Sequence, residues 1–190
     1  SSKRYSKMKA KPCLDTVKKS QTILALPDGT LSETYQITRL CLSAAVCAHN
    51  LSFIIRLHPI LPKSKIERYL KSLSSGRLPH NLRFSSDDLD TDISNAQWCL
   101  YRSSSTVFNA AAQMVIPFFV GTEDERTIDP LLILDLGSHI PPSLTCHIQL
   151  LDLISHSKFQ LGDSWLAKRC QSYYHPFEPL QLLQCLGLNV

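Results

Sequence analysis

The sequence predicts an α/β fold with a doubly wound, mainly parallel sheet. Short apolar runs alternate with longer amphipathic segments between residues 22 and 120, and short connections of about two to six residues separate them. Such alternation is typical of strand-helix-strand units, whose strands all run in the same direction. The chain has 190 residues, of which 44% are hydrophobic, so it can bury one good core but not two. We therefore expect one sheet domain with appended segments.

A strand-helix-strand unit begins the predicted domain. The apolar run "TILAL" at 22–26 predicts a buried strand, which the turn signal "PDG" ends. Residues 31–50 carry apolar side chains near helical spacing, with Ser32 able to cap this helix and Asn50 able to stop it. The run "SFIIRLHP" predicts a second strand, which ends at Pro59.

The alternation continues along the chain and includes a short helix with an acidic cap. Helices are predicted at 63–75, 88–96 and 104–114, and strands at 81–85, 97–102 and 115–120. The segment "DPLLILDL" at 129–136 fits either a strand or a helix, and apolar stripes in "LTCHIQLLDLI" and "PLQLLQCLGL" predict helices beyond it. We therefore divide the chain into a basic leader at 1–20, a sheet domain at 21–140 and a helical tail at 141–190.

Charge is unevenly distributed along the chain. Residues 1–20 hold seven Lys or Arg and one Asp, a charge of +6, so the other 170 residues carry −2 of the total of +4. A nearly neutral domain argues against a nucleic-acid-binding protein, which would spread basic residues over one face. No run approaches the roughly 18 apolar residues of a membrane span. We expect at most a peripheral contact between the leader and an acidic membrane surface.

The seven cysteines and the acidic run "DLDTD" argue against a metal site. The cysteines are scattered, and no Cys or His pair has metal-ligand spacing. The acidic run lies on a predicted short helix, where carboxylates cap the N-terminus more often than they chelate. We expect reduced cysteines in a cytoplasmic protein, associated at most with the inner face of the membrane, and no metal or other cofactor.

The stretch "LYRSSSTVFNAAA" places four hydroxyls between a predicted strand and an alanine-rich helix. They belong to Ser103, Ser104, Ser105 and Thr106. A helix cap needs only one hydroxyl, so the plainer interpretation is a cap with solvent-facing neighbours. The alternative is an anion site, in which these hydroxyls and the positive end of the helix dipole bind a phosphate.

The context of the hydroxyls favours the anion site. The clusters "PDGT", "HP", "RSSST" and "GTEDERTIDP" each follow a predicted strand directly. The carboxyl ends of parallel strands meet at one edge of the sheet, and α/β proteins bind ligands there. Each cluster alone is a weak signal, because the same residues make ordinary turns and solvated loops. Four of them at successive strand ends predict one crevice.

These motifs in this order resemble the carboxyl-terminal half of bacterial GT-B glycosyltransferases that build surface polysaccharides. The likeness is carried by "LPDG" after the first strand, "RLHP" after the second, "YRSSST" before the alanine-rich helix and "IDPL" further on. It spans about residues 20–136 and is greatest for sialyltransferase-like and Kdo-transferase-like enzymes, which use CMP-activated sugars. The resemblance implies a Rossmann-like donor-binding domain of an inverting, metal-independent glycosyltransferase, with a nucleotide sugar as substrate and a glycan as acceptor.

The resemblance also implies roles for single residues. His58 would sit at the donor phosphate, as a hydrogen-bond donor or as a general acid to the departing nucleotide. In the sialyltransferases the catalytic base lies in the other domain, so Asp28 is expected to shape the first loop around the donor instead. The whole expected nucleotide and phosphate site consists of Ser103, Ser104, Ser105, Thr106, Asp28, Gly29 and Arg102.

A GT-B enzyme places its active site between two Rossmann-like domains, and this chain has room for only the donor-binding one. We expect the acceptor-binding half to lie elsewhere, in a longer polypeptide or in a partner chain, and the isolated chain to be inactive without it. Two alternatives stay open. One is a non-catalytic nucleotide-binding or protein-interaction module, and the other is a GT-B domain that uses a UDP-sugar or a CDP-alditol.

Overall fold

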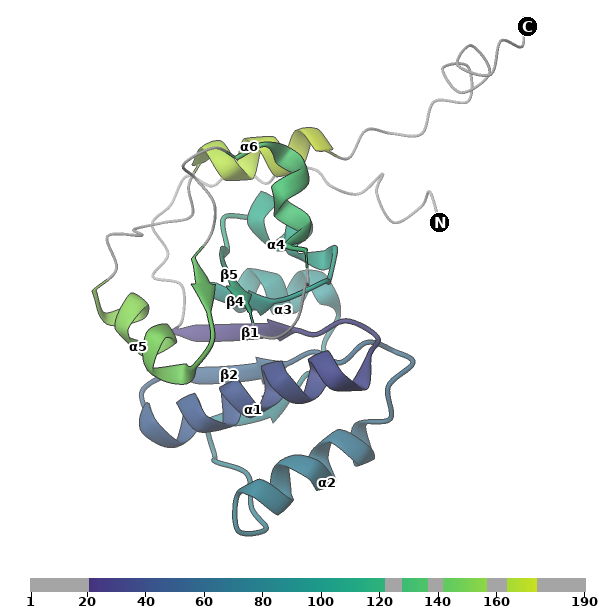
Figure 1. The fold of residues 1–190 in the computed structure, drawn as a ribbon, viewed down its shortest axis with the longest axis vertical. Coiled ribbons are helices and arrows are strands. Elements are labelled where there is room, and N and C mark those ends of the chain that lie inside the picture. The colour runs from purple at the N-terminus through teal and green to yellow at the C-terminus, as the bar shows by residue number, and fades with distance from the viewer. Residues whose placement is uncertain (1–20, 122–127, 137–141, 157–163, 174–190) are drawn as a thin grey trace, which may run out of the picture.

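The computed structural model describes residues 21–121, 128–136, 142–156 and 164–173 (Figure 1). They contain one sheet of six strands in the order β3-β2-β1-β4-β5-β6, and all neighbours in it are parallel. The strands are β1 (Thr22–Leu26), β2 (Ser52–Ile55), β3 (Leu82–Phe84), β4 (Trp98–Tyr101), β5 (Ile116–Val120) and β6 (Ser143–Leu144). This order is that of a Rossmann-like fold, so the predicted α/β class is confirmed.

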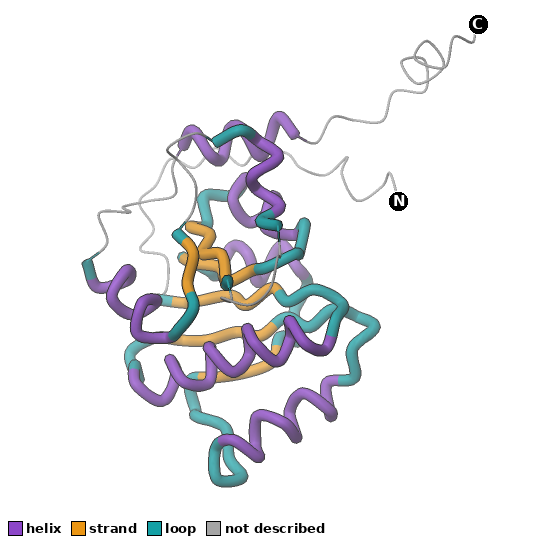
Figure 2. Tube along the Cα trace, in the orientation of Figure 1, coloured by secondary structure: helices purple, strands orange, loops and turns teal. Residues whose placement is uncertain are grey.

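Helices cover both faces of the sheet, as in a doubly wound fold (Figure 2). One face packs against α1 (Leu31–Cys47), α2 (Lys63–Leu73) and α5 (His147–Ser155). The other packs against α3 (Leu89–Asn95), α4 (Thr106–Ala112), α6 (Ser164–Tyr173) and the 3-10 helix η2 (Pro130–Leu134). The two faces therefore have separate apolar cores.

The strand β1 shows why the sheet could be predicted from apolar runs. Ile23 and Ala25 lie in the core with α1, whereas Leu24 and Leu26 lie in the core with α4. All four are at most 2% exposed. A strand that is buried on both faces carries apolar residues at every position, and "TILAL" has that pattern.

The helices predicted between residues 31 and 114 form, although their ends are shifted. The acidic cap of α3 is confirmed, because Asp88 Oδ1 accepts a hydrogen bond from the backbone N–H of Thr91 at 2.8 Å. The expectation that Ser32 caps α1 was wrong, since the N-cap is Thr30 and the chain is already helical at the next residue. The helix also ends before Asn50.

The chain after β5 differs more from the prediction. Of the two alternatives for "DPLLILDL", the helix forms, as the 3-10 helix η2. The segment interpreted as a helical tail also contributes β6, which pairs with Phe119 and Val120 of β5. A strand of two residues leaves no periodic pattern in a sequence. The second apolar stripe of the tail, at 179–188, and the leader lie outside the described residues. No described helix is long and apolar enough to cross a membrane.

Candidate functional site

The carboxyl ends of the strands form the edge at which we expected the polar clusters to gather. β1 and β4 are neighbours, but the helices that follow them, α1 and α4, cover opposite faces of the sheet. Such a change of side is a topological switch point, where open α/β sheets bind ligands. The loop 27–30 after β1 and the turn 102–105 after β4 flank this point, and His58 follows the adjacent β2. Three of the four clusters thus share one edge; residues 122–127 of the fourth lie outside the described residues.

Asp28 and Gly29 shape the loop after β1. Asp28 Oδ1 accepts hydrogen bonds from the N–H and the hydroxyl of Thr30, both at 2.8 Å. A Cβ atom added to Gly29 would lie 2.9 Å from Ile60 Cδ1 and 3.5 Å from His58 Nδ1. The missing side chain of Gly29 therefore lets the loops after β1 and β2 touch, which brings three of the predicted site residues together.

His58 is exposed, and its imidazole is oriented by its own loop. Its Nδ1 accepts a hydrogen bond from the backbone N–H of Ile60 at 3.4 Å. The neutral ring then carries its proton on Nε2. Within the described part of the chain Nε2 has no partner, so its N–H is available to donate to a ligand oxygen.

Residues 103–106, called the serine turn from here on, carry four hydroxyls with different surroundings. Ser103 Oγ donates a hydrogen bond to Glu33 Oε1 at 2.8 Å. Ser105 is the N-cap of α4, and its side chain makes no cap hydrogen bond. The hydroxyls of Ser104 and Thr106 are half-buried and have no hydrogen-bond partner among the described residues. No serine side chain therefore caps α4, and two hydroxyls are available to a ligand.

Arg102 is fully buried, whereas we expected it to contact the nucleotide. Its Nη1 donates a hydrogen bond to Gln36 Oε1, and its Nε lies 3.7 Å from Glu33 Oε1. Both partners belong to the beginning of α1. A buried guanidinium needs such partners, because an unpaired buried charge is costly. Arg102 thus fastens the serine turn to α1 across the switch point.

Glu33 is an acidic residue of this edge that the sequence analysis missed. Its Oε1 faces Ser103 and Arg102, whereas its Oε2 is buried and has no hydrogen-bond partner among the described residues. Burial raises the pKa of this carboxyl group; Asp28 also raises it, while Ser103 and Arg102 oppose the shift. Thr30 and Glu33 have the spacing of a capping box. The sequence pattern around Glu33 is therefore typical of a helix cap, not of a ligand site.

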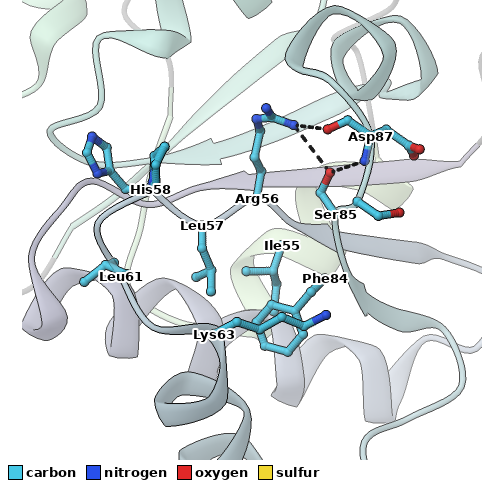
Figure 3. A pocket seen from close by; sticks show the side chains of 11 residues that line it. Ile55, Arg56, Leu57, His58, Leu61, Lys63, Phe84, Ser85 and Asp87 are labelled. Atoms are coloured by element: carbon cyan, nitrogen blue, oxygen red, sulfur yellow. Dashed lines mark hydrogen bonds between the residues drawn. The ribbon is translucent and has the colours of Figure 1, made fainter.

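A cavity of about 240 Å³ lies beside His58, between the loops after β2 and β3 (Figure 3). Its lining includes the apolar side chains of Ile55, Leu57 and Phe84 and the polar side chains of Arg56, Lys63 and Ser85. Lys63 Nζ lies 5.3 Å from the centroid of the Phe84 ring, a cation–π distance. The lining is thus mixed, with more polar than apolar residues. The sequence did not predict this cavity.

A charged network forms one wall of the cavity, and Asp92 of α3 is its centre. Asp92 is fully buried, and its Oδ2 accepts hydrogen bonds from Arg56 Nη1 at 2.6 Å and Ser85 Oγ at 2.5 Å. Arg56 Nη1 also donates to the backbone carbonyl of Asp87 at 2.8 Å. The network fastens the ends of β2 and β3 to α3, so the wall has a fixed shape.

The motif "IDPL" joins the same edge through Asp129. Its carboxylate accepts hydrogen bonds from the Tyr101 hydroxyl, at 3.0 Å to Oδ1 and 2.9 Å to Oδ2, and from the backbone N–H of Leu131 at 2.9 Å. Burial raises the pKa of Asp129. Because Tyr101 ends β4, this contact fastens η2 to the carboxyl edge. The described residues include no group of three His, Cys, Asp or Glu side chains that could hold a metal ion.

No protein-family model and no curated protein matches this sequence. The fold is similar to a putative UDP-N-acetylglucosamine 2-epimerase from Listeria monocytogenes, with a TM-score of 0.52 and 11% sequence identity, over 88% of this chain and 43% of that chain. It is also similar to the C-terminal CMP-Kdo-binding domain of WaaA from Acinetobacter baumannii, with a TM-score of 0.52 and 11% identity, over 82% of this chain and 89% of that chain. The chain thus spans less than half of the epimerase chain, and at this identity the similarity shows a shared fold.

Proposed function

We propose that this chain is the donor-binding domain of a glycosyltransferase that uses a CMP-activated sugar, of the nonulosonic acid or Kdo type, to build a surface glycan. The supporting observation is that His58, Gly29 and the serine turn lie at the carboxyl edge of one parallel sheet, where Gly29 adjoins the loop of His58 and His58 lines a cavity. Motifs in this order carry the resemblance to such enzymes. The similar fold of a domain described as CMP-Kdo-binding agrees with the proposal.

The proposed chemistry assigns the phosphate to the switch point. A nucleotide that leaves as a phosphate anion needs hydrogen-bond donors aimed at the developing charge. The Nε2–H of His58 and the hydroxyls of Ser104 and Thr106 are donors without a partner among the described residues, and Ser105 completes the turn. Arg102 would hold the turn in place rather than touch the ligand. The transfer is proposed to invert the anomeric centre without a metal or other cofactor.

The proposal includes partners that lie outside this chain. The acceptor is a glycan, bound by a second half in a longer polypeptide or a partner chain, and the protein would work in the cytoplasm, in peripheral contact with the membrane at most. A UDP-sugar is the second candidate donor, because one similar structure is described as a putative UDP-N-acetylglucosamine 2-epimerase.

Calorimetric titration of the chain with CMP, CDP and UDP tests the proposal and ranks the donors. His58→Ala should weaken binding of CMP but leave binding of cytidine, which lacks the phosphate, unchanged. Replacing Ser104 and Thr106 with Ala should weaken the binding of CMP by about 1–3 kcal/mol, the scale of lost hydrogen bonds to a charged group. Binding of no nucleotide at millimolar concentration would instead favour a non-catalytic interaction module.

A further inference from the structure

Within the part of the chain that the structure describes, only one side of the Arg56 guanidinium has hydrogen-bond partners. These hydrogen bonds are made by Nη1, with Asp92, Ser85 and the carbonyl of Asp87 as acceptors. Asp92 is fully buried and carries the charge that balances Arg56. The guanidinium plane is therefore fixed by groups from the loop after β3 and from α3.

The other side of the guanidinium is available to a ligand. Among the described residues neither Nε nor Nη2 of Arg56 has a hydrogen-bond or ion-pair partner, and the side chain is 28% exposed. Arg56 lines the 240 Å³ cavity and stands between His58 and the loop that carries Ser85 and Asp87 (Figure 3). The Nε–Nη2 edge of an arginine presents two parallel N–H groups, which match the two oxygens of a carboxylate or phosphate.

The charges around the cavity favour an anion at this place. Arg56, Lys63 and His58 line it, and the one acidic side chain in its lining, Asp87, lies 3.6 Å from the guanidinium of Arg83. At the other end of the edge Glu33 lies beside the serine turn. The cavity lining itself thus holds more basic than acidic side chains, and it contains the preorganised arginine, whose charge is balanced from behind by Asp92.

We propose that Arg56 is the anion anchor of this cavity and binds an oxyanion of the ligand through Nε and Nη2. This inference rests on the nucleotide-sugar function proposed above and deepens it, because it adds a residue that binds an acidic group of the donor. The acidic group is either the phosphate of the nucleotide or the carboxylate of an acidic sugar, because both present the same pair of oxygens to a guanidinium.

The test compares three ligands by calorimetry: cytidine, CMP, and CMP linked to a nonulosonic acid. Arg56→Lys keeps the charge opposite Asp92 but loses the paired N–H groups. The double variant Arg56→Gln with Asp92→Asn removes both charges, so that no buried charge is left unpaired. Arg68→Gln, on the exposed side of α2, makes the same change of charge outside the cavity lining and serves as the control.

Both Arg56 variants should bind the acidic ligand about 10- to 100-fold more weakly, the loss expected for hydrogen bonds between charged groups. The Arg56 variants should bind cytidine as tightly as the wild type does. The control variant Arg68→Gln should bind all three ligands as the wild type does. If the Arg56 variants lose affinity for CMP as well as for the CMP-linked acid, Arg56 binds the phosphate. If they lose affinity only for the CMP-linked acid, Arg56 binds the carboxylate. If the Arg56 variants bind each of the three ligands as tightly as the wild type does, the inference is overturned.

Failure of the proposed function gives a different result. In that case the wild type binds no cytidine compound at millimolar concentration, and the anchor is tested alone with inorganic phosphate and with acetate. The Nε–H proton resonance of Arg56, assigned by its loss in Arg56→Lys, should shift with these anions and not with chloride. No shift with either anion would overturn the anchor as well.

Discussion

Glu33 places a carboxyl group beside the turn at which we propose that the donor phosphate binds. Its neighbours are Asp28, Arg102 and Ser103, and burial holds its pKa above the ordinary value. A bound phosphate would favour the protonated carboxyl, so binding should be linked to proton uptake and should weaken as the pH rises through the pKa of Glu33. We predict that Glu33→Gln, which has no charge, binds CMP roughly tenfold more tightly than the wild type at about pH 8. This equals about 1.4 kcal/mol, a moderate repulsion at an effective dielectric constant of about 20.

Calorimetry of both proteins over a range of pH checks this prediction. The phosphate of CMP also titrates, with a second pKa of about 6, so the quantity to compare is the difference between variant and wild type, which should vanish at low pH. Glu67→Gln on α2 removes a half-buried carboxylate paired with Lys71 and should leave the pH profile unchanged. A pH-independent difference for Glu33→Gln would contradict the proposed neighbourhood of carboxyl and phosphate.

Single site residues were predictable where the signal is local. His58, Asp28 and Gly29 follow apolar strands directly, so a sequence pattern is enough to place them at the carboxyl edge. Glu33 and the partners of Arg56 depend on contacts between distant parts of the chain: Ser103 is 70 residues from Glu33, and Asp92 is 36 residues from Arg56. No spacing rule reports such pairs. Arg102, next to the serines in sequence, was expected at the ligand, but its direction depends on where α1 packs.

The contact between the loops after β1 and β2 belongs to the scale of elements, and Gly29 makes it possible. In Gly29→Ala the new Cβ would lie 2.9 Å from the Cδ1 of Ile60. Ile60 is 71% exposed and can rotate, so the free energy of unfolding should change by less than about 1 kcal/mol. The new methyl group would also lie 3.5 Å from His58 Nδ1, so it and the displaced Ile60 side chain crowd the imidazole, and we predict that CMP affinity falls about 3- to 10-fold.

Adding Ile60→Ala to Gly29→Ala removes the close contact and should restore the affinity. Calorimetry and thermal unfolding of the single and double variants separate the two effects. If the double variant binds as weakly as Gly29→Ala, the contact with Ile60 is not what lowers the affinity.

The C-terminal end of α1 depends on Asn81, at the opposite edge of the sheet. Its Nδ2 donates to the carbonyls of Ala45, Ala48 and Leu51 at 3.1, 3.0 and 2.9 Å. These include helix-end carbonyls that no later residue of the helix can satisfy. Asn81→Ala should therefore lower the free energy of unfolding by about 1–3 kcal/mol, measured by urea denaturation. CMP affinity should stay unchanged under native conditions, and a loss of affinity with unaltered stability would show that the two edges are not independent.

Among the elements, the core ones were predictable and the peripheral ones were not. β1, β2, β4 and β5 have continuous apolar runs because both of their faces are buried, and α3 has an acidic cap in its sequence. β6 has only two residues, and the two partners of its register lie in β5, so it exists through pairing rather than through its own pattern. The 3-10 helix η2 is held by Asp129, whose carboxylate accepts hydrogen bonds from the Tyr101 hydroxyl and the backbone N–H of Leu131. Tyr101 is distant in the sequence, so a local pattern does not report this contact.

At the scale of the whole molecule, the strand order explains why scattered motifs form one site. The order reverses between β1 and β4, so the loops that follow these strands turn to opposite faces and leave a crevice between them. The first strand, second strand and fourth strand each deliver a polar loop to this edge. The parallel direction of all strands, which the alternation of elements predicted, is therefore what converts three weak motifs into a candidate site.

The last prediction concerns what the chain can do by itself. Transfer needs an acceptor hydroxyl held in line with the anomeric carbon, and such positioning lowers a barrier by roughly 7–11 kcal/mol. In the glycosyltransferases that the sequence resembles, the acceptor site and the base come largely from the other domain, and this chain spans 43% of the similar epimerase chain. We predict that the 190-residue chain binds CMP but shows no acceptor-dependent release of CMP from a CMP-sugar, measured by chromatography. Adding the second half, as a longer polypeptide or a partner chain, should start the release. Efficient turnover by the chain alone would contradict the two-domain argument and make Asp28 and Glu33 the carboxylates to test as the base.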